Sequence, residues 1–257
     1  MKDIGIKQKI KDGRLLLGSW ITLSHPSIAE IMSESAFDWL VVDMEHSAIS
    51  LSDAQALIRV MELKGTAPLV RVGENSANLI KRVMDAGAHG VVVPMVNSAA
   101  DAERAVSAVK YPPRGTRGVG LARAQKYGFG FSEYLKWNQE NSIVIVQIEH
   151  IDAVNNFEEI LAVDGVDGFI IGPYDLSGSL GVPGEFENEN VKRALDRVKE
   201  VSRKSPHIMP GFHVVDPDPD MLREKYEEGY RFLGYGLDTI FLGKAVQGAL
   251  SPLKDLK

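Results

Sequence analysis

Short apolar runs alternate with helix-like segments along the whole chain, and this alternation limits the folds that the chain can adopt. Each run is four to eight residues long, rich in Val, Ile and Leu, and bounded by polar residues, Gly or Pro. Such runs are typical of strands that are buried on both faces of a parallel sheet. We expect eight strands, at Leu15–Thr22, Trp39–Asp43, Ala67–Val72, Gly90–Met95, Ile143–Ile148, Gly168–Ile171, His207–Val214 and Arg231–Tyr235.

The segments between these runs carry apolar residues at helical spacing, and many end at Gly. Below the first strand we expect a short helix at Ile4–Lys11 that would cap the bottom of a barrel. Further helices are expected at Pro26–Ser35, around Ala56–Met61, and at Asn78–Ala86, Ala99–Val109, Glu133–Gln139, Ala153–Leu161, Asn190–Arg203, Met221–Gly229 and Asp238–Leu250. The long stretch after Tyr111 is irregular, and long structured loops in compact domains are usually functional.

This strand and helix alternation allows either an eight-stranded barrel or a doubly wound open sheet. The open sheet would normally carry a glycine-rich phosphate-binding turn after its first strand, and the segment 23–26 is not such a turn. A barrel typically needs about 250 residues, close to the 257 of this chain. We therefore predict an α/β fold, a (β/α)8 TIM barrel that forms a single domain over residues 1–257.

Charge and cysteine content narrow the class of partner. A formal net charge of −6 and a pI near 5.6 argue against a nucleic-acid or anionic-membrane surface, because phosphate affinity comes mainly from Lys and Arg. No cysteine occurs, which fits a reducing compartment and leaves only oxygen and imidazole as metal ligands. No segment resembles a signal peptide or a membrane span. We expect a cytoplasmic, soluble protein with a small-molecule partner, no nucleic acid and no membrane.

Polar residues follow the apolar runs at the carboxyl ends of the expected strands, where barrels place their active sites. They are Asp43, Glu45, His46, Arg71, Gln147, Glu149 and Asp175. Each one alone has an ordinary structural explanation, such as a hydrogen-bonded histidine, an ion-paired arginine or an acidic helix cap. Their convergence is harder to explain in that way. Glu149 and Asp175 follow adjacent strands, so their like charges would be costly unless a cation lies between them.

Two carboxylates, with the remaining positions open to water and substrate, suit Mg²⁺ or Mn²⁺ better than structural zinc. Gln147 points the same way as the carboxylate two residues after it and would hydrogen-bond whatever fills the open positions. Arg71 would offer a positive fork to a carboxylate or an enolate oxygen. His46 is the natural proton carrier, because histidine titrates near neutrality. Either Asp43 or Asp85 would orient it.

Several motifs are together specific enough to indicate a family. They are Asp43-Met44-Glu45-His46, Pro68-Leu69-Val70-Arg71, Val93-Pro94-Met95-Val96, Tyr111-Pro112-Pro113-Arg114-Gly115-Thr116-Arg117-Gly118, Gln147-Ile148-Glu149 and Gly172-Pro173-Tyr174-Asp175-Leu176-Ser177. With them the chain resembles the HpcH/HpaI family of metal-dependent pyruvate aldolases, which includes 4-hydroxy-2-oxoheptanedioate and 2-dehydro-3-deoxyglucarate aldolases. The resemblance spans nearly the whole chain. It implies the barrel fold and a class II aldolase, a carbon–carbon lyase that reversibly cleaves a 4-hydroxy-2-oxo acid to pyruvate and an aldehyde.

The resemblance also implies roles for single residues. Glu149 and Asp175 match the metal ligands, with Mg²⁺ or Mn²⁺ expected and Co²⁺ or Zn²⁺ as alternatives, and His46 matches the general base. Arg71 matches the residue that stabilises the enolate, and Asp85 the carboxylate that raises the basicity of the histidine. The expected substrate-binding residues are Trp20, Gln147, Gly172, Tyr174 and Asp175. Family subunits exchange a terminal helix and assemble with active sites at subunit interfaces, so we expect a homohexamer.

Three departures from the family pattern surround the expected aldehyde pocket. The segment 47–50 after the histidine differs from the usual continuation, Tyr174 stands where a smaller residue is common, and the segment 211–220 is unlike the familiar seventh loop. These departures leave the pyruvate half intact and the identity of the aldehyde open. His213, within the last segment, has either a polar contact with the aldehyde or a structural role at a strand tip.

Three other interpretations keep the barrel but change its chemistry. A Schiff-base aldolase needs a lysine at a strand end inside the barrel mouth, and Lys64, Lys81, Lys110 and Lys204 fall on helices or outer loops. A citrate-lyase β-like acyl-CoA lyase would need a nucleotide-sized cleft with extra basic residues. A non-catalytic binding barrel would have little reason to keep acids, base and arginine together.

Overall fold

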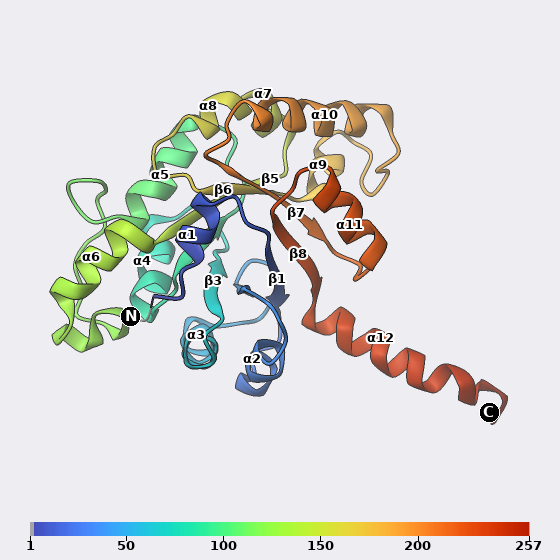
Figure 1. Ribbon diagram of the computed structural model, residues 1–257, viewed down its shortest axis with the longest axis horizontal. Coiled ribbons are helices and arrows are strands. Elements are labelled where there is room, and N and C mark those ends of the chain that lie inside the picture. The colour runs from blue at the N-terminus through green and yellow to red at the C-terminus, as the bar shows by residue number, and fades with distance from the viewer. Residues whose placement is uncertain (1–2, 257) are drawn as a thin grey trace.

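Eight parallel strands close into a barrel in this computed structural model, which describes residues 3–256 of the chain. Each strand pairs with the next along the chain, and the last pairs with the first, while helices surround the barrel (Figure 1). The predicted (β/α)8 barrel is confirmed. The strands are β1 (Leu16–Ile21), β2 (Trp39–Asp43), β3 (Ala67–Arg71), β4 (Gly90–Val93), β5 (Ile143–Ile148), β6 (Gly168–Ile171), β7 (Met209–Val214) and β8 (Phe232–Leu237).

Helices connect the strands and cover the outside of the barrel wall. Within the described part of the chain, none of them combines the length and the apolar character that crossing a membrane requires. They are α1 (Ile6–Lys11), α2 (Pro26–Ser33), α3 (Leu51–Lys64), α4 (Ala77–Ala86), α5 (Ala99–Val109), α6 (Phe131–Asn141), α7 (Ile151–Asn155), α8 (Phe157–Leu161), α9 (Pro173–Ser179), α10 (Glu189–Arg203), α11 (Pro219–Glu227), α12 (Asp238–Leu250) and the short 3₁₀ helices η1 (Arg123–Gly128) and η2 (Ser251–Leu256).

Side chains alternate between the inside and the outside of the barrel wall along each strand. In β2, Trp39 and Val41 pack inside the barrel, whereas Leu40 and Val42 pack against the surrounding helices. The next inward position is Asp43, the last residue of the strand. Counting in twos therefore places the last inward side chain at the open carboxyl end of the barrel.

Helix α1 closes the opposite, amino-terminal end of the barrel, as predicted. Ile6 and Ile10 of this helix are buried in the cluster that fills the barrel interior. In that cluster they accompany Leu16 and Phe232, the first residues of β1 and β8. Because α1 fills the floor in this way, the barrel interior opens at its carboxyl end, where the strand-end residues line a pocket.

A column of aromatic rings rises through the barrel interior to its mouth. Trp39 stacks on Phe232 with ring centroids 4.2 Å apart, and its edge meets Trp20 at 5.5 Å. Trp20 in turn stacks on His213, again at 4.2 Å. The packing of the barrel floor is thus connected, ring by ring, to a side chain at the mouth.

The structure differs from the predicted elements at two places, and α3 begins five residues before and ends three residues after the predicted Ala56–Met61, while the other element ends shift by at most two residues. The helix predicted at Ala153–Leu161 is broken into α7 and α8 at Asn156, where the backbone turns (φ −96°, ψ 12°) and the side-chain amide donates to the carbonyl of Asn97 at 2.8 Å. Residues 173–179 form helix α9, which was not among the predicted helices. Pro173 starts this helix, because its fixed φ suits the first helical position.

Gly18 in β1 lies against the Trp39 ring, and a Cβ there would be 2.0 Å from a ring atom. Gly18→Ala should therefore displace the aromatic column and lower the free energy of unfolding by about 2 kcal/mol, measured by urea denaturation. Gly248→Ala in α12, where a Cβ would meet no atom within 4 Å, is the control and should leave stability unchanged or slightly higher. Equal stability of Gly18→Ala and the wild type would contradict the expected clash.

Candidate active site

Asp43 and Arg71 form an ion pair where β2 and β3 end. Arg71 donates from Nε at 2.9 Å and from Nη2 at 2.6 Å to the two carboxylate oxygens of Asp43, a two-point contact that fixes the guanidinium plane. The backbone N–H groups of Glu45 and His46 donate to the same carboxylate. Burial works to raise the pKa of Asp43, but Arg71 and these donors outweigh it and lower the pKa below its usual value. Asp43 is therefore an ionised anchor for Arg71 and for the turn that carries the histidine.

The sequence leaves open whether Asp43 or Asp85 orients the imidazole of His46. In the structure, Asp43 contacts the backbone of His46, and Asp85 pairs with Arg117 at 2.5 Å. Among the side chains that the structure describes, the one acidic group within 4 Å of the imidazole nitrogens is Glu45, with 3.9 Å between Oε2 and Nε2. The histidine ring is 64% exposed, and none of these described carboxylates lies at hydrogen-bond distance from it.

Glu45 lies between the arginine and the histidine. Its Oε2 is 3.4 Å from Nε of Arg71, is buried, and has no hydrogen-bond partner among the residues that the structure describes. Burial raises the pKa of Glu45; Arg71 opposes that shift, and the charges of Asp43 and Asp175 add to it. Glu45 is thus an acidic group whose negative charge has only a partial counter-charge.

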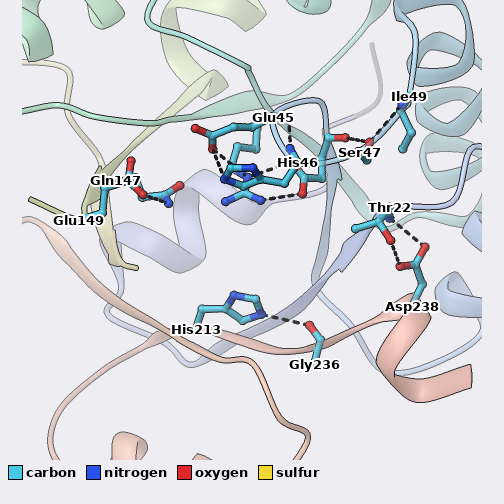
Figure 2. Close-up of polar contacts among 12 residues, drawn as sticks. Thr22, Glu45, His46, Ser47, Ile49, Gln147, Glu149, His213, Gly236 and Asp238 are labelled. Atoms are coloured by element: carbon cyan, nitrogen blue, oxygen red, sulfur yellow. Dashed lines mark hydrogen bonds and ion pairs between the residues drawn. The ribbon is translucent and has the colours of Figure 1, made fainter. Parts of the chain in front are cut away.

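Glu149 follows β5 and is buried on the other side of the site. The backbone N–H of Met95 donates to its Oε1 at 2.7 Å, and the side-chain amide of Gln147 donates to its Oε2. Figure 2 shows Gln147 and Glu149 across the site from Glu45. Burial raises the pKa of Glu149 to about 7; the N–H of Met95 opposes the shift, and the charges of Glu45 and Asp175 add to it. Two neighbouring carboxylates, Glu45 and Asp175, therefore act on the buried carboxyl group of Glu149.

A pocket of about 170 Å³ lies in the barrel mouth between the strand ends and α9. Six residues predicted for the site line it together: Trp20, Arg71, Gln147, Gly172, Tyr174 and Asp175. His213 and Val215 form the wall on the side of β7. The structure thus assembles the predicted site in one place, with Asp43, His46 and Glu149 joined to it through the contacts described above and Asp85 elsewhere.

Asp85 belongs to a separate cluster that fixes the long loop after α5. Arg117, whose side chain is fully buried, pairs with it and lies over the rings of Tyr111 and Tyr134 at 4.7 and 5.5 Å. The side-chain amide of Gln125 donates to the hydroxyl of Tyr111 at 2.7 Å and to Asp85 at 3.4 Å. The loop is therefore ordered around the carboxylate that the family resemblance links to catalysis.

Comparison with known proteins shows which family has this sequence and architecture. The model of the HpcH/HpaI aldolase/citrate lyase family matches residues 16–245. A 2-keto-3-deoxy-L-rhamnonate aldolase of Escherichia coli K12 is 34% identical over 257 residues, covering 98% of this chain and 93% of that protein. The chain belongs to the HpcH/HpaI aldolase/citrate lyase family.

Solved structures of HpcH/HpaI proteins agree with this assignment. An HpcH/HpaI aldolase/citrate lyase family protein from Burkholderia cenocepacia J2315 has a TM-score of 0.91 at 32% identity, covering 98% of this chain and 100% of that one. An HpcH/HpaI aldolase from Desulfitobacterium hafniense DCB-2 has a TM-score of 0.89 at 30% identity, with coverage of 98% and 97%. The family resemblance seen in the sequence is confirmed, and with it the prediction of an aldolase, a carbon–carbon lyase.

Two groups at the HpcH/HpaI site received no role from the sequence. Glu45 belongs to the strand-end motif, which is the signal that marks it, but its position between Arg71 and His46 depends on the turn after β2. Met95 has a left-handed backbone (φ 51°) and contributes its N–H to Glu149. A backbone N–H donor does not depend on the type of side chain, so the sequence gives no direct signal for it.

The acidic side of the site fits a hard divalent cation. Among the side chains that the structure describes, no three His, Asp or Glu groups are arranged to hold a metal. A cation held by Glu149 and Asp175 would therefore need water and substrate to complete its shell. Gly172 leaves room, because a Cβ there would lie 3.2 Å from both Oε2 of Glu149 and the amide nitrogen of Gln147. The Oε1 atom of Gln147 is buried without a hydrogen-bond partner among these residues, and a cation-bound water would satisfy it.

Burial of Glu149 gives a prediction for the chelator-treated protein. Folding raises the pKa of Glu149 from 4.5 to about 7. The protonated carboxyl group therefore contributes fully to the stability of the folded protein below pH 4.5, and this contribution is lost as the pH rises through 7. Glu149→Gln keeps the shape without the charge and should raise the free energy of unfolding by about 3 kcal/mol at pH 8, with little effect at pH 4.5. Urea denaturation at both pH values measures this. Glu158→Gln on the exposed side of α8 is the control, and a pH-independent effect of Glu149→Gln would contradict the argument.

Proposed function

We propose that this chain, as one barrel domain over residues 1–257, is a divalent-metal-dependent class II aldolase that cleaves a 4-hydroxy-2-oxo acid to pyruvate and an aldehyde and also runs the reverse addition. The observation that carries the proposal is a small pocket lined by Asp175 and by Arg71, which Asp43 fixes, with Glu149 held next to it by Gln147 of the pocket lining. The Escherichia coli relative is named for a 2-keto-3-deoxy acid. We extend that class, a 2-keto-3-deoxy sugar acid, to this chain.

Glu149 and Asp175 would hold the cation, with Mg²⁺ or Mn²⁺ as first candidates and Co²⁺ or Zn²⁺ as alternatives. When bound, such a cation polarises the keto group of the substrate and neutralises negative charge that develops there. Glu149 needs such a counter-charge, because burial raises the pKa of its carboxyl group to about 7. Gln147 donates to Glu149 and keeps its carboxylate directed into the site.

Arg71 stabilises the negative charge that collects on the pyruvate enolate as the carbon–carbon bond breaks. Asp43 accepts from Nε and Nη2, which leaves further guanidinium N–H groups for the pocket that Arg71 lines. Because the ion pair orients the arginine before substrate binds, little reorganisation is needed during the reaction. Donors fixed in this way typically contribute a few kcal/mol of transition-state stabilisation.

His46 acts as the proton carrier. In cleavage its imidazole takes the proton of the C4 hydroxyl while the C3–C4 bond breaks, and the enolate then gains one proton at C3 to give pyruvate; in the addition, C3 loses a proton and the imidazole returns its proton to the new hydroxyl. The ring is largely exposed at the edge of the site, so it exchanges protons with solvent readily. Glu45 is the neighbouring acidic group, with 3.9 Å between its Oε2 and Nε2 of the ring.

We infer that Asp85 reaches the histidine of a neighbouring copy. In one chain, Asp85 lies in the cluster around Arg117, and the loop that follows that arginine exposes large apolar side chains. Leu121 and Phe129 are 65% and 95% exposed, and exposed apolar clusters commonly mark protein contacts. A second copy docked on this loop would bring its His46 to the carboxylate, in agreement with the interface active sites that the family resemblance implies.

The carboxyl-terminal helix supports an oligomer built by helix exchange. Asp238 anchors its first turn by accepting from the backbone N–H of Thr22 at 2.8 Å, and α12 then extends away from the barrel (Figure 1). Leu242, Val246 and Leu250, at four-residue spacing, are each about half exposed. We propose that this apolar stripe packs on a second copy and that such exchanges build a homohexamer.

The pocket favours the aldolase over the other interpretations. Its volume of about 170 Å³ suits pyruvate with a short aldehyde and lies below the roughly 300–1,000 Å³ of sites for larger ligands, so an acyl-CoA substrate is disfavoured. Among the described residues that line it, the basic one is Arg71 and none is lysine, so a Schiff base has no amine in the pocket. A cytoplasmic location stays a prediction from the sequence.

The purified protein should release pyruvate from a 2-keto-3-deoxy sugar acid in the presence of Mg²⁺ or Mn²⁺, lose this activity on chelation, and regain it when the cation is restored.

His46→Ala should lower kcat by roughly 10²–10⁴-fold, while Mn²⁺ affinity measured by calorimetry stays unchanged. His207→Ala, at an exposed histidine, is the control. Full activity of His46→Ala would refute the role of the histidine, and pyruvate release that resists chelation would refute metal dependence.

Val246→Glu places a charge in the apolar stripe of α12 and should shift the protein from a hexamer to smaller species, because the partner surface would bury an unpaired charge. Light scattering coupled to size-exclusion chromatography measures the mass. Gln247→Glu adds the same charge at the adjacent exposed position and should leave the mass unchanged. A hexameric mass for Val246→Glu would remove α12 from the assembly interface.

A further inference from the structure

His213 shares the pocket with the proposed catalytic residues but has no part in the chemistry described above. It is the last inward side chain of β7, counted in twos from Met209, and it lines the pocket beside Val215. Its ring stacks on Trp20 with centroids 4.2 Å apart and an interplanar angle of 12°. The imidazole therefore has a fixed orientation in the barrel mouth before any ligand binds.

The neighbouring strand β8 is shaped to admit this stack. A Cβ at Gly234 would lie 2.5 Å from the Trp20 ring and 3.0 Å from the ring of His213. Any larger residue at that position would push the two rings apart or tilt them. Close packing, rather than chance contact, thus holds the histidine ring in place.

The hydrogen bond of His213 decides its tautomer. Nε2 lies 3.2 Å from the carbonyl oxygen of Gly236, and because a carbonyl can only accept, Nε2 carries the hydrogen. Burial lowers the pKa of His213 to about 4, so the ring is neutral near pH 7 and has only that one N–H. Nδ1 is left with a lone pair, and in Figure 2 this nitrogen is on the side of the ring that faces Gln147 and Glu45.

We propose that His213 selects the aldehyde, with its Nδ1 accepting a hydrogen bond from a hydroxyl group on the carbon next to the aldehyde carbon. This inference rests on the aldolase function proposed above and names the class of its second substrate, a short, uncharged hydroxyaldehyde. An aldehyde with hydrogen in place of the hydroxyl leaves Nδ1 without a donor. A carboxylate at that place can only accept hydrogen bonds. It would face Nδ1, which is also an acceptor, so binding of an aldehyde that carries a carboxylate there is disfavoured.

Tyr174 limits the length of the aldehyde that follows this hydroxyl. Its ring forms part of the pocket wall and meets Phe186 edge to face, with centroids 4.9 Å apart and an interplanar angle of 83°. In a pocket of about 170 Å³, a pyruvate unit leaves space for only a few further atoms. His213 thus sets the polarity of the aldehyde, and Tyr174 sets its size.

Three two-carbon aldehydes test the proposal, because they differ only at the group that Nδ1 would meet. Glycolaldehyde carries a hydroxyl, acetaldehyde a hydrogen and glyoxylate a carboxylate. The measured quantity is kcat/KM for the addition of pyruvate to each, expressed as the ratios glycolaldehyde to acetaldehyde and glyoxylate to acetaldehyde. Comparing these ratios between variants cancels both the intrinsic reactivity of each aldehyde and any loss of folded enzyme.

His213→Leu removes the acceptor and should lower the glycolaldehyde to acetaldehyde ratio about tenfold, the effect of one lost hydrogen bond, while the glyoxylate to acetaldehyde ratio rises. His213→Asn places Oδ1 near the position of Nδ1 and should keep the first ratio within about threefold of the wild type. His207→Leu makes the same chemical change at an exposed site and should change neither ratio. An unchanged ratio in His213→Leu, or the same fall in His207→Leu, would overturn the proposal.

Exchange of the pyruvate C3 hydrogens with D₂O, followed by NMR in the wild type with Mn²⁺ or Mg²⁺ and no aldehyde, tests enolate formation separately. Exchange together with the expected change in ratio supports both proposals. Exchange with an unchanged ratio in His213→Leu refutes the role of His213 alone. Absence of exchange in the wild type refutes the proposed aldolase, and the present inference with it.

Discussion

The mouth of this barrel depends on the alternation of side chains along its parallel strands. Trp39 and Val41 are held inside by the core, so the next inward position, Asp43, must face the open end. Arg71 is its register partner on β3, and the two meet as an ion pair without help from a ligand. A shift of one residue in either strand would turn its charged side chain into the layer between barrel and helices. The apolar core therefore fixes the position of the charge that the chemistry needs.

Around this ion pair, buried carboxylates lie near one another, an electrostatic repulsion that folding alone would not favour. Burial raises the pKa of Glu45 and of Glu149, the charge of Asp175 adds to both shifts, and Arg71, which opposes both shifts, already shares its charge with Asp43. In a core built only for stability, such carboxylates would be replaced by neutral groups. Local conflicts of this kind are expected at functional sites, and a divalent cation is the ligand that would relieve this one.

The strands and the strand-end site were predictable because a strand buried on both faces leaves a continuous apolar run that stops where the polar mouth begins. What the sequence could not supply depends on tertiary contacts between distant segments. The break at Asn156 follows from its bond to the carbonyl of Asn97, and Met95 acts through a backbone N–H. The choice of Asp43 rather than Glu45 as the main partner of Arg71 follows from strand register and from the turn after β2, neither of which composition or spacing reveals.

The way each residue is held also explains which parts of the site are able to vary. Arg71 and Gln147 are strand residues whose positions the closed barrel fixes, and both line the part of the pocket that we propose binds pyruvate. Tyr174 lies in the first turn of a short helix beyond a strand end, and loops and strand ends tolerate change more readily than the wall itself. His213 is the exception, since it is a strand residue that the Trp20 stack and the carbonyl of Gly236 hold rigidly. A rigid, neutral acceptor beside Tyr174 and Asp175 in the pocket wall is the kind of preorganised group that the proposed discrimination between aldehydes would use.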